Sequence, residues 1–154
     1  MMIYETRPSR VIGVDFTVEQ LGKARRLAAE SGIDWVEFRA GRIENPPVDD
    51  ASVDCVMSNC LINLSADKER VFAEVARVLR PGGRLAIADI VSERPLTESI
   101  VCDANLWASC IGGAAQQDAY RDTVEATGLQ VTAICGTAAS SSPSGPAGPA
   151  PAMA

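Results

Sequence analysis

The stretch that decides the fold, residues 53–90, reads VDCVMSNCLINLSADKERVFAEVARVLRPGGRLAIADI. Its first part, residues 53–58, is a short apolar run typical of a strand, and Ser65 is placed to cap a helix whose valines recur at helical spacing. The Pro-Gly-Gly sequence at 81–83 stops this helix and turns the chain into a second apolar run at 85–90. The stretch therefore predicts a strand, a helix, a turn and a further strand.

The same alternation precedes this stretch. Residues 11–14 form an apolar run, and the next helix is expected to begin at Thr17, which forms a capping box with Gln20. Gly32 is placed to end that helix, and residues 35–39 are a further strand candidate. Two such alternations in succession predict an α/β, doubly wound fold, in which helices cover a mostly parallel sheet.

The remainder of the chain predicts two helices, a strand and a tail. Residues 100–111 and 118–127 have helical patterns, and residues 129–135 have the pattern of a last strand. From residue 136 the chain is almost entirely Ala, Ser, Gly, Pro and Thr, which cannot bury enough apolar area to offset the entropy lost on ordering. We therefore expect one domain over residues 1–135 and a disordered tail over 136–154.

Charge and composition exclude several classes of partner. The 154 residues include 14 basic and 20 acidic side chains, a net charge of −6, so we expect no nucleic-acid partner, since phosphate contacts need clustered Lys and Arg. No apolar stretch approaches the length of a membrane helix, and residues 1–10 lack the apolar core of a signal peptide. These features predict a cytoplasmic protein without a membrane partner.

Cysteine and histidine usage limits the chemistry. The chain has five cysteines without CxxC spacing, which favours free thiols over a disulfide framework or a zinc ribbon. It has no histidine, so it lacks the commonest general base and the commonest metal ligand. Any chemistry of this chain must therefore proceed without a histidine.

Candidate functional residues follow the predicted strands, because ligands of open parallel sheets bind at the carboxyl ends of the strands. Asp15 there can accept hydrogen bonds from ribose hydroxyls, or it can be a solvated acid at a helix N-terminus. The loop at 41–44 can cover an adenine ring or be an ordinary surface loop. Asn59 and Cys60 interrupt an apolar run at the same edge, and Cys60 can equally be a small core residue. Cys110, just before a glycine pair, indicates little by itself.

Taken together, the residue strings resemble those of arsenite methyltransferases, a family of class I methyltransferases that use S-adenosylmethionine. The resemblance covers residues 11 to about 135, and its two narrowest strings contain Cys60 and Cys110. The strings, in chain order, are VIGVD at 11–15, GRIE at 41–44, SNCLINL at 58–64, LRPGGR at 79–84 and CIGGA at 110–114. The resemblance implies a Rossmann-like fold, S-adenosylmethionine as methyl donor and trivalent arsenic as acceptor.

The resemblance also implies a role for each matching residue. Cys60 and Cys110 would be the two thiolates that bind arsenic, and trivalent arsenic is soft enough to prefer thiolate ligands. The arsenic lone pair carries no proton, so its attack on the methyl group requires no general base. An external thiol such as glutathione or thioredoxin would supply a third ligand or carry arsenite. The implied cofactor contacts are Asp15 to the ribose, Ile43 and Glu44 at the adenine, and Asn59 near the methionine portion.

The chain departs from the family at its beginning. The family's domain starts with a strand and a glycine-rich GxGxG loop, and residues 1–10 resemble neither. We therefore expect an N-terminally truncated domain. The strand that is not matched normally lies between those that start at Val11 and Val53, so we expect unpaired edges on both.

Two alternatives remain open from the sequence. One is a methyltransferase that acts on a small organic molecule, in which Cys60 and Cys110 only pack. The other is a non-catalytic arsenic-binding remnant that no longer binds the cofactor. These alternatives differ in whether arsenic, the cofactor or both should bind.

Overall fold

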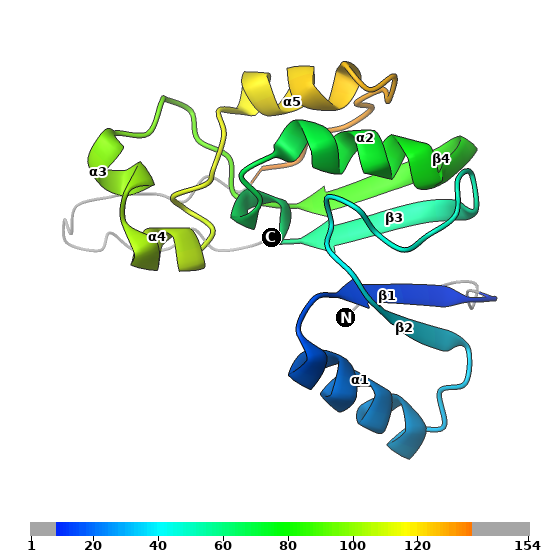
Figure 1. Cartoon of the computed structure of the whole chain (residues 1–154). Helices are drawn as coiled ribbons and strands as arrows, with labels where there is room; N and C mark the ends of the chain where they lie inside the picture. Colours follow the sequence, from blue (N-terminus) through cyan, green and yellow to red (C-terminus); the bar gives the residue numbers. More distant parts are fainter. Residues whose placement is uncertain (1–8, 137–154) are drawn as a thin grey trace, which may run out of the picture.

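The computed structural model describes residues 9–136 and confirms the predicted alternation of strands and helices (Figure 1). The predicted tail over 137–154 lies outside the described residues. No helix among the described residues is long and apolar enough to cross a lipid bilayer. The elements, in chain order, are β1 (Val11–Asp15), α1 (Val18–Glu30), β2 (Val36–Ala40), β3 (Val53–Asn59), the short 3-10 helix η1 (Ile62–Leu64), α2 (Lys68–Val78), β4 (Leu79–Ala88), α3 (Glu98–Val101), α4 (Ala104–Ala108) and α5 (Gln117–Glu125).

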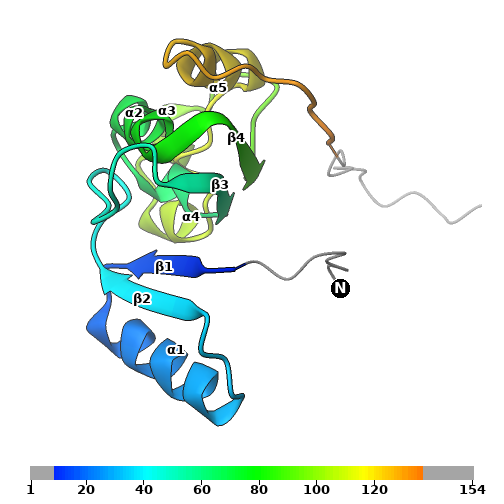
Figure 2. The ribbon, with the colours of Figure 1, turned by 90° about the vertical axis from the view of Figure 1, so that its right-hand side faces the viewer.

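The four strands form two separate parallel pairs. Within residues 9–136, β1 pairs with β2 alone and β3 with β4 alone, so the expected unpaired edges of β1 and β3 are present. All four strands point their carboxyl ends toward the side of the molecule where α4 lies (Figure 1). Figure 2 shows β1, α1 and β2 as one lobe beside the lobe that contains the other elements. The candidate residues therefore lie at one end of two neighbouring sheets.

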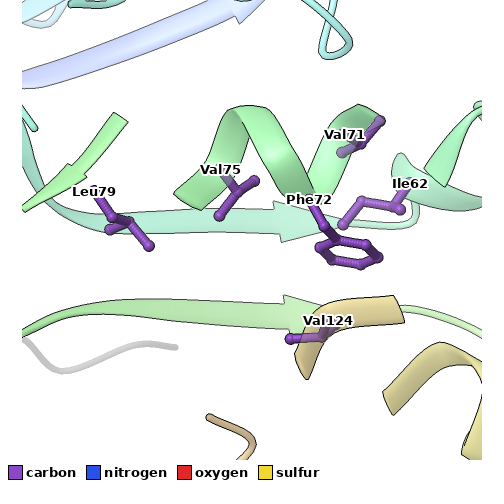
Figure 3. Close-up of a cluster of buried hydrophobic side chains, with 6 residues drawn as sticks. All are labelled: Ile62, Val71, Phe72, Val75, Leu79 and Val124. Atoms are coloured by element: carbon purple, nitrogen blue, oxygen red, sulfur yellow. The ribbon is translucent and has the colours of Figure 1, made fainter. Parts of the chain in front are cut away.

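The core lies in the second lobe, between the β3–β4 sheet, α2 and α5 (Figure 3). Phe72 of α2 is fully buried, and its ring meets that of Tyr120 edge-on, with centroids 5.3 Å apart. Full burial of one such side chain contributes about 1.5–3 kcal/mol. The buried cluster consists of Ile62, Val71, Phe72, Val75, Leu79 and Val124.

The Pro-Gly-Gly segment is not a turn outside the strand, as expected, but an irregularity within β4. Val53 pairs with Leu79, whereas Cys55 pairs with Arg84, so the chain bulges out between these two pairings while it stays alongside β3. Gly82 in this bulge has a φ of 79°, which a residue without a Cβ adopts most readily. The glycine thus allows β4 to begin directly after α2.

Of the two predicted helix caps, the position of the first is confirmed and the second is wrong. Thr17 is the N-cap residue of α1, as expected, but its side chain makes no capping bond. The Asp15 carboxylate, rather than Gln20, accepts the hydrogen bond from the Thr17 N–H at 2.7 Å. The cap of α2 is Asp67, which accepts from the Arg70 N–H at 2.9 Å. The Ser65 hydroxyl instead donates to the Glu44 carboxylate. In both places a carboxylate accepts the backbone hydrogen bond that another side chain was expected to accept.

The last part of the domain is less regular than its pattern predicted. The expected helix over 100–111 is broken into α3 and α4, because Asp103 caps the start of α4 through the N–H groups of the next turn. The expected strand over 129–135 is wrong, since this segment forms no ladder with β4. Its apolar residues Leu129 and Val131 pack against the core cluster instead. The helix expected over 118–127 is confirmed as α5.

Candidate functional site

Cys60 follows the last residue of β3 in an unusual backbone conformation. Its φ is 52°, in the left-handed region that side chains other than Gly, Asn and Asp rarely adopt. The Cys60 N–H donates to the Ala88 carbonyl at 2.8 Å, which continues the β3–β4 ladder for one bond beyond the strand. The Cys60 side chain is exposed. The sheet therefore fixes this backbone while leaving its thiol accessible to a ligand.

Cys110 occupies a position where helices usually place glycine. After α4 ends, the Ile111 N–H donates to the Leu106 carbonyl and the Cys110 N–H to the Trp107 carbonyl, both at 2.9 Å. This pattern is a Schellman motif, whose left-handed residue is commonly Gly, and here Cys110 takes it with a φ of 62°. The left-handed conformation costs an L-residue roughly 1–2 kcal/mol. Such a local cost at a non-glycine residue is typical of a position selected for its side chain.

The structure brings these two cysteines together. The Cys110 thiol donates to the main-chain carbonyl oxygen of Cys60, with Sγ and O 2.8 Å apart. Cys110 is buried, whereas Cys60 is exposed, so one cysteine of the pair is accessible and the other is covered. Burial raises the pKa of the Cys110 thiol, and the neighbouring Cys60 and Asp89 raise it further. The Cys110 thiol therefore holds its proton more firmly than an ordinary cysteine.

Asp89 is a further residue of this site that our sequence reasoning missed. It directly follows β4, and the nearby N–H groups of Asn63, Ile62 and Ile90 act to lower the pKa of its carboxyl. The Tyr120 hydroxyl lies 3.4 Å from the same carboxylate, and burial raises the pKa of Asp89. The signal was in the sequence, since an acid after the apolar run at 85–88 stands at the same sheet edge as Asp15.

Asp15 lies at the carboxyl end of β1, in the other sheet. A groove of about 240 Å³ lies against it and is also lined by Gly13, Leu21 and Phe38. The Oδ1 atom of Asp15 accepts from the Thr17 N–H, but a carboxylate has lone pairs for several bonds. Asp15 can thus help to fix the start of α1 and also accept hydrogen bonds from a ligand.

Ile43 and Glu44 are held by the protein itself. Ile43 packs against the core cluster, so its side chain is not a free surface for a ring. Glu44 accepts from the Ser65 hydroxyl at 2.7 Å, which lowers the pKa of Glu44, and it lies 3.7 Å from Arg42. By contrast, Asn59 is exposed at the carboxyl end of β3, directly before Cys60. Of the expected cofactor contacts, Asn59 is exposed, whereas Asp15, Ile43 and Glu44 are partly buried.

No group of three or more His, Cys, Asp or Glu side chains among residues 9–136 is arranged to hold a metal ion. The two adjacent thiols can instead bind a thiophilic atom that accepts two sulfur ligands. This arrangement differs from a structural zinc site, which is closed by four ligands. The described residues thus offer a pair of neighbouring cysteines at this edge of the sheet.

Comparison with known proteins agrees with the fold and the motifs. A family model described as a methyltransferase domain matches residues 1–128. The arsenite methyltransferase of Halobacterium salinarum is 42% identical over 124 residues, which cover 80% of this chain and 32% of that protein. The expected resemblance to arsenite methyltransferases is thus confirmed. The chain spans about a third of the length of the first curated relatives it matches.

Solved structures of similar chains have the expected class I, Rossmann-like fold. An arsenic(III) S-adenosylmethionine methyltransferase from Chlamydomonas reinhardtii is 34% identical with a TM-score of 0.69, over 77% of this chain and 43% of that one. The YcgJ protein of Bacillus subtilis is 26% identical with a TM-score of 0.68, over 77% of this chain and 52% of that one. The predicted fold class is confirmed by these similarities.

Proposed function

The chain belongs to the methyltransferase domain family, and we propose that it transfers a methyl group from S-adenosylmethionine to trivalent arsenic held by Cys60 and Cys110. The observation that carries the proposal is the contact between the Cys110 thiol and the Cys60 carbonyl, 2.8 Å apart, at the carboxyl end of β3. The similarity to arsenite methyltransferases over 80% of the chain supports arsenite as the substrate.

The two cysteines suit the binding of arsenite. Each As–S bond that forms replaces an As–O bond, and the thiol proton leaves with that oxygen as water, so no oxidant or reductant is needed. A thiol with a raised pKa, such as that of Cys110, keeps its proton until this exchange takes place. Two thiolates leave the arsenic lone pair free for methyl transfer, and a held geometry lowers the entropic cost of the reaction.

Two residues of the chain fit the cofactor best. S-adenosylmethionine, when bound, supplies an electrophilic methyl group. Asp15 lies against a groove at the end of β1 and has acceptor capacity for ribose hydroxyls. Asn59 is exposed and carries both a donor and an acceptor for the polar methionine portion. Ile43 and Glu44 fit less well as adenine contacts, because the core and Ser65 occupy them.

The remaining ligand of arsenic is proposed to come from outside the chain. Cys55, Cys102 and Cys135 are exposed, and none of them is hydrogen-bonded to Cys60 or Cys110 in the described part of the chain. A small thiol such as glutathione, or a protein thiol such as thioredoxin, can deliver arsenite to Cys60, since that thiol is the accessible one. A reducing cytoplasmic setting would keep all of these thiols free.

Arsenite binding tests the substrate part of the proposal. Equilibrium dialysis should give about a tenfold or greater loss of affinity for both Cys60→Ser and Cys110→Ser, because each variant leaves only one As–S bond. Cys102→Ser is the matched control, since this exposed cysteine lies on the C-terminal side of α3, and it should bind as the wild type does. Unchanged affinity in either variant would favour the small-molecule methyltransferase with packing cysteines.

Calorimetry with S-adenosylmethionine tests the cofactor part. Asp15→Asn keeps an acceptor for the Thr17 N–H but loses the charge, and it should lower the affinity for the cofactor by about tenfold. Asp122→Asn, at an exposed position of α5, should bind the cofactor as the wild type does. Arsenite binding without any heat of cofactor binding in the wild type would favour the arsenic-binding remnant.

A further inference from the structure

A buried amide lies between the two turns that carry the thiols. Asn63 is 0% exposed, and its Nδ2 donates to the Ile90 carbonyl at 2.7 Å and to the Cys110 carbonyl at 3.3 Å. Asn63 belongs to η1, which begins two residues after Cys60. One side chain therefore connects the turn after Cys60, the end of the β4 segment and the turn that contains Cys110.

The backbone of Asn63 is fixed as closely as its side chain. Its N–H lies close enough to the Asp89 carboxylate to lower the pKa of that carboxyl, and a Cβ placed on Gly113 would collide with the Asn63 carbonyl oxygen. The second glycine after Cys110 therefore allows the two turns to approach each other to backbone contact. This close approach sets the separation of the two turns, and the amide of Asn63 sets their relative orientation.

The position is not explained by packing alone. The Oδ1 atom of Asn63 is buried and has no hydrogen-bond partner among the described residues. A buried acceptor without a partner costs stability, so an apolar side chain would serve better if the position only filled space. Cys60 and Cys110 both have left-handed backbones, which persist only where the surroundings hold them. The Nδ2 bonds of Asn63 hold the second of these turns directly.

We propose that Asn63 is the positioning residue that holds the turns of Cys60 and Cys110 in one geometry, so that the two thiols bind a single arsenic atom together. The inference rests on the proposed function and adds a residue that contacts neither arsenic nor the cofactor. Asn63 acts through the main-chain carbonyl of Cys110 and through η1. Without it each thiol can still react, but the two cannot act as one ligand pair.

The test compares two arsenicals that differ in the number of thiols they bind. Phenylarsenous acid has two exchangeable oxygen ligands and binds two thiols, whereas dimethylarsinous acid has one and binds one thiol. Asn63→Ser removes the reach to both carbonyls without introducing a charge. It should weaken the binding of phenylarsenous acid by about tenfold, which is the effect typical of residues that orient a ligand. The affinity for dimethylarsinous acid should stay within about twofold of the wild-type value. A merely destabilising substitution would not separate the two probes.

Matched variants complete the experiment. Asn105→Ser, at an exposed position of α4, should bind both arsenicals as the wild type does. If circular dichroism shows that Asn63→Ser is unfolded, Asn63→Leu, which fills the space, takes its place with the same expected result. Wild-type affinity of the folded Asn63 variant for phenylarsenous acid would overturn the inference. That result leaves the proposed function standing, because the proposed function is tested separately by the arsenite affinities of Cys60→Ser and Cys110→Ser and by the heat of cofactor binding.

Discussion

The Sγ atom of Cys110 lies 2.8 Å from the carbonyl oxygen of Cys60, although the two residues are 50 positions apart in the chain. One residue follows a strand and the other ends a helix, and both have positive φ values. Two unrelated elements thus place a cysteine in a conformation that favours glycine, at the same point in space. This coincidence is difficult to explain if either thiol only fills the core.

The raised pKa of Cys110 predicts that its thiol becomes reactive only at a higher pH than an ordinary cysteine thiol. Alkylation requires the thiolate, so Cys110 should react with iodoacetamide more slowly than Cys60 at pH values near neutrality. Its rate should rise only above the pH at which ordinary thiols react, because burial disfavours the charged form. Peptide mapping by mass spectrometry over a pH series measures both thiols in one sample.

Replacing Asp89 tests one cause of that shift. The negative charge of Asp89 disfavours the Cys110 thiolate, so Asp89→Asn should lower the pKa of Cys110 and move its alkylation profile to lower pH. Asp118→Asn, in the first turn of α5, is the control and should leave the profile unchanged. A profile moved to higher pH in Asp89→Asn would contradict the assigned role of the carboxylate.

The left-handed backbone of Cys110 predicts that glycine stabilises the protein more than alanine at this position, the reverse of their order within a helix. In a helix Gly is less stable than Ala by roughly 0.5–1 kcal/mol, but at a left-handed position Ala is the costlier residue by roughly 1–2 kcal/mol. We expect Cys110→Gly to be more stable than Cys110→Ala in urea unfolding. Neither variant should bind arsenite with wild-type affinity. Ala108→Gly, at the last residue of α4, is the control and should lower stability, as glycine does within a helix.

The regular elements could be predicted because their signals are local. The helical spacing in α2 and the apolar runs of β1 and β3 follow from side-chain periodicity, which the sequence contains directly. The prediction of a strand over 129–135 was wrong because the alternation there reflects packing of Leu129 and Val131 on the core, and within residues 9–136 no strand pairs with this segment. A strand depends on a partner that periodicity does not reveal.

The site could be predicted only as residue types at a sheet edge. The approach of Cys110 to Cys60 depends on the tight contact between Gly113 and Asn63, which no local pattern encodes. Ile43 was expected to face a ligand but packs on the core, because the loop that carries it is drawn in by the bond between Glu44 and Ser65. Such long-range contacts decide which residues remain free for a ligand.

The buried ring of Phe72 predicts a large loss of stability on truncation. Phe72 is 0% exposed and packs edge-on against Tyr120, so Phe72→Ala should cost about 3–5 kcal/mol of unfolding free energy. Phe16 is the matched control, since it is 65% exposed and its ring lies under the Arg42 guanidinium, 5.4 Å from the ring centroid. Phe16→Ala should change stability by less than about 1 kcal/mol. Equal losses in urea unfolding would contradict the placement of the core.

The division into two sheets predicts unequal protection from hydrogen exchange. The core cluster lies wholly in the lobe of β3, β4 and α2, whereas Leu21 is the one buried hydrophobic residue described for β1, α1 and β2. The amides of residues 11–40 should therefore exchange at least about tenfold faster than those of residues 53–88, because local opening requires less apolar surface to be exposed. Mass spectrometry of peptic fragments measures both lobes in one time course.

If S-adenosylmethionine binds at Asp15, adding it should slow exchange in the first lobe more than in the second, since a ligand stabilises the segment that it contacts. Equal protection of the two lobes without ligand would mean that they unfold as one cooperative unit despite the unpaired edges of β1 and β3.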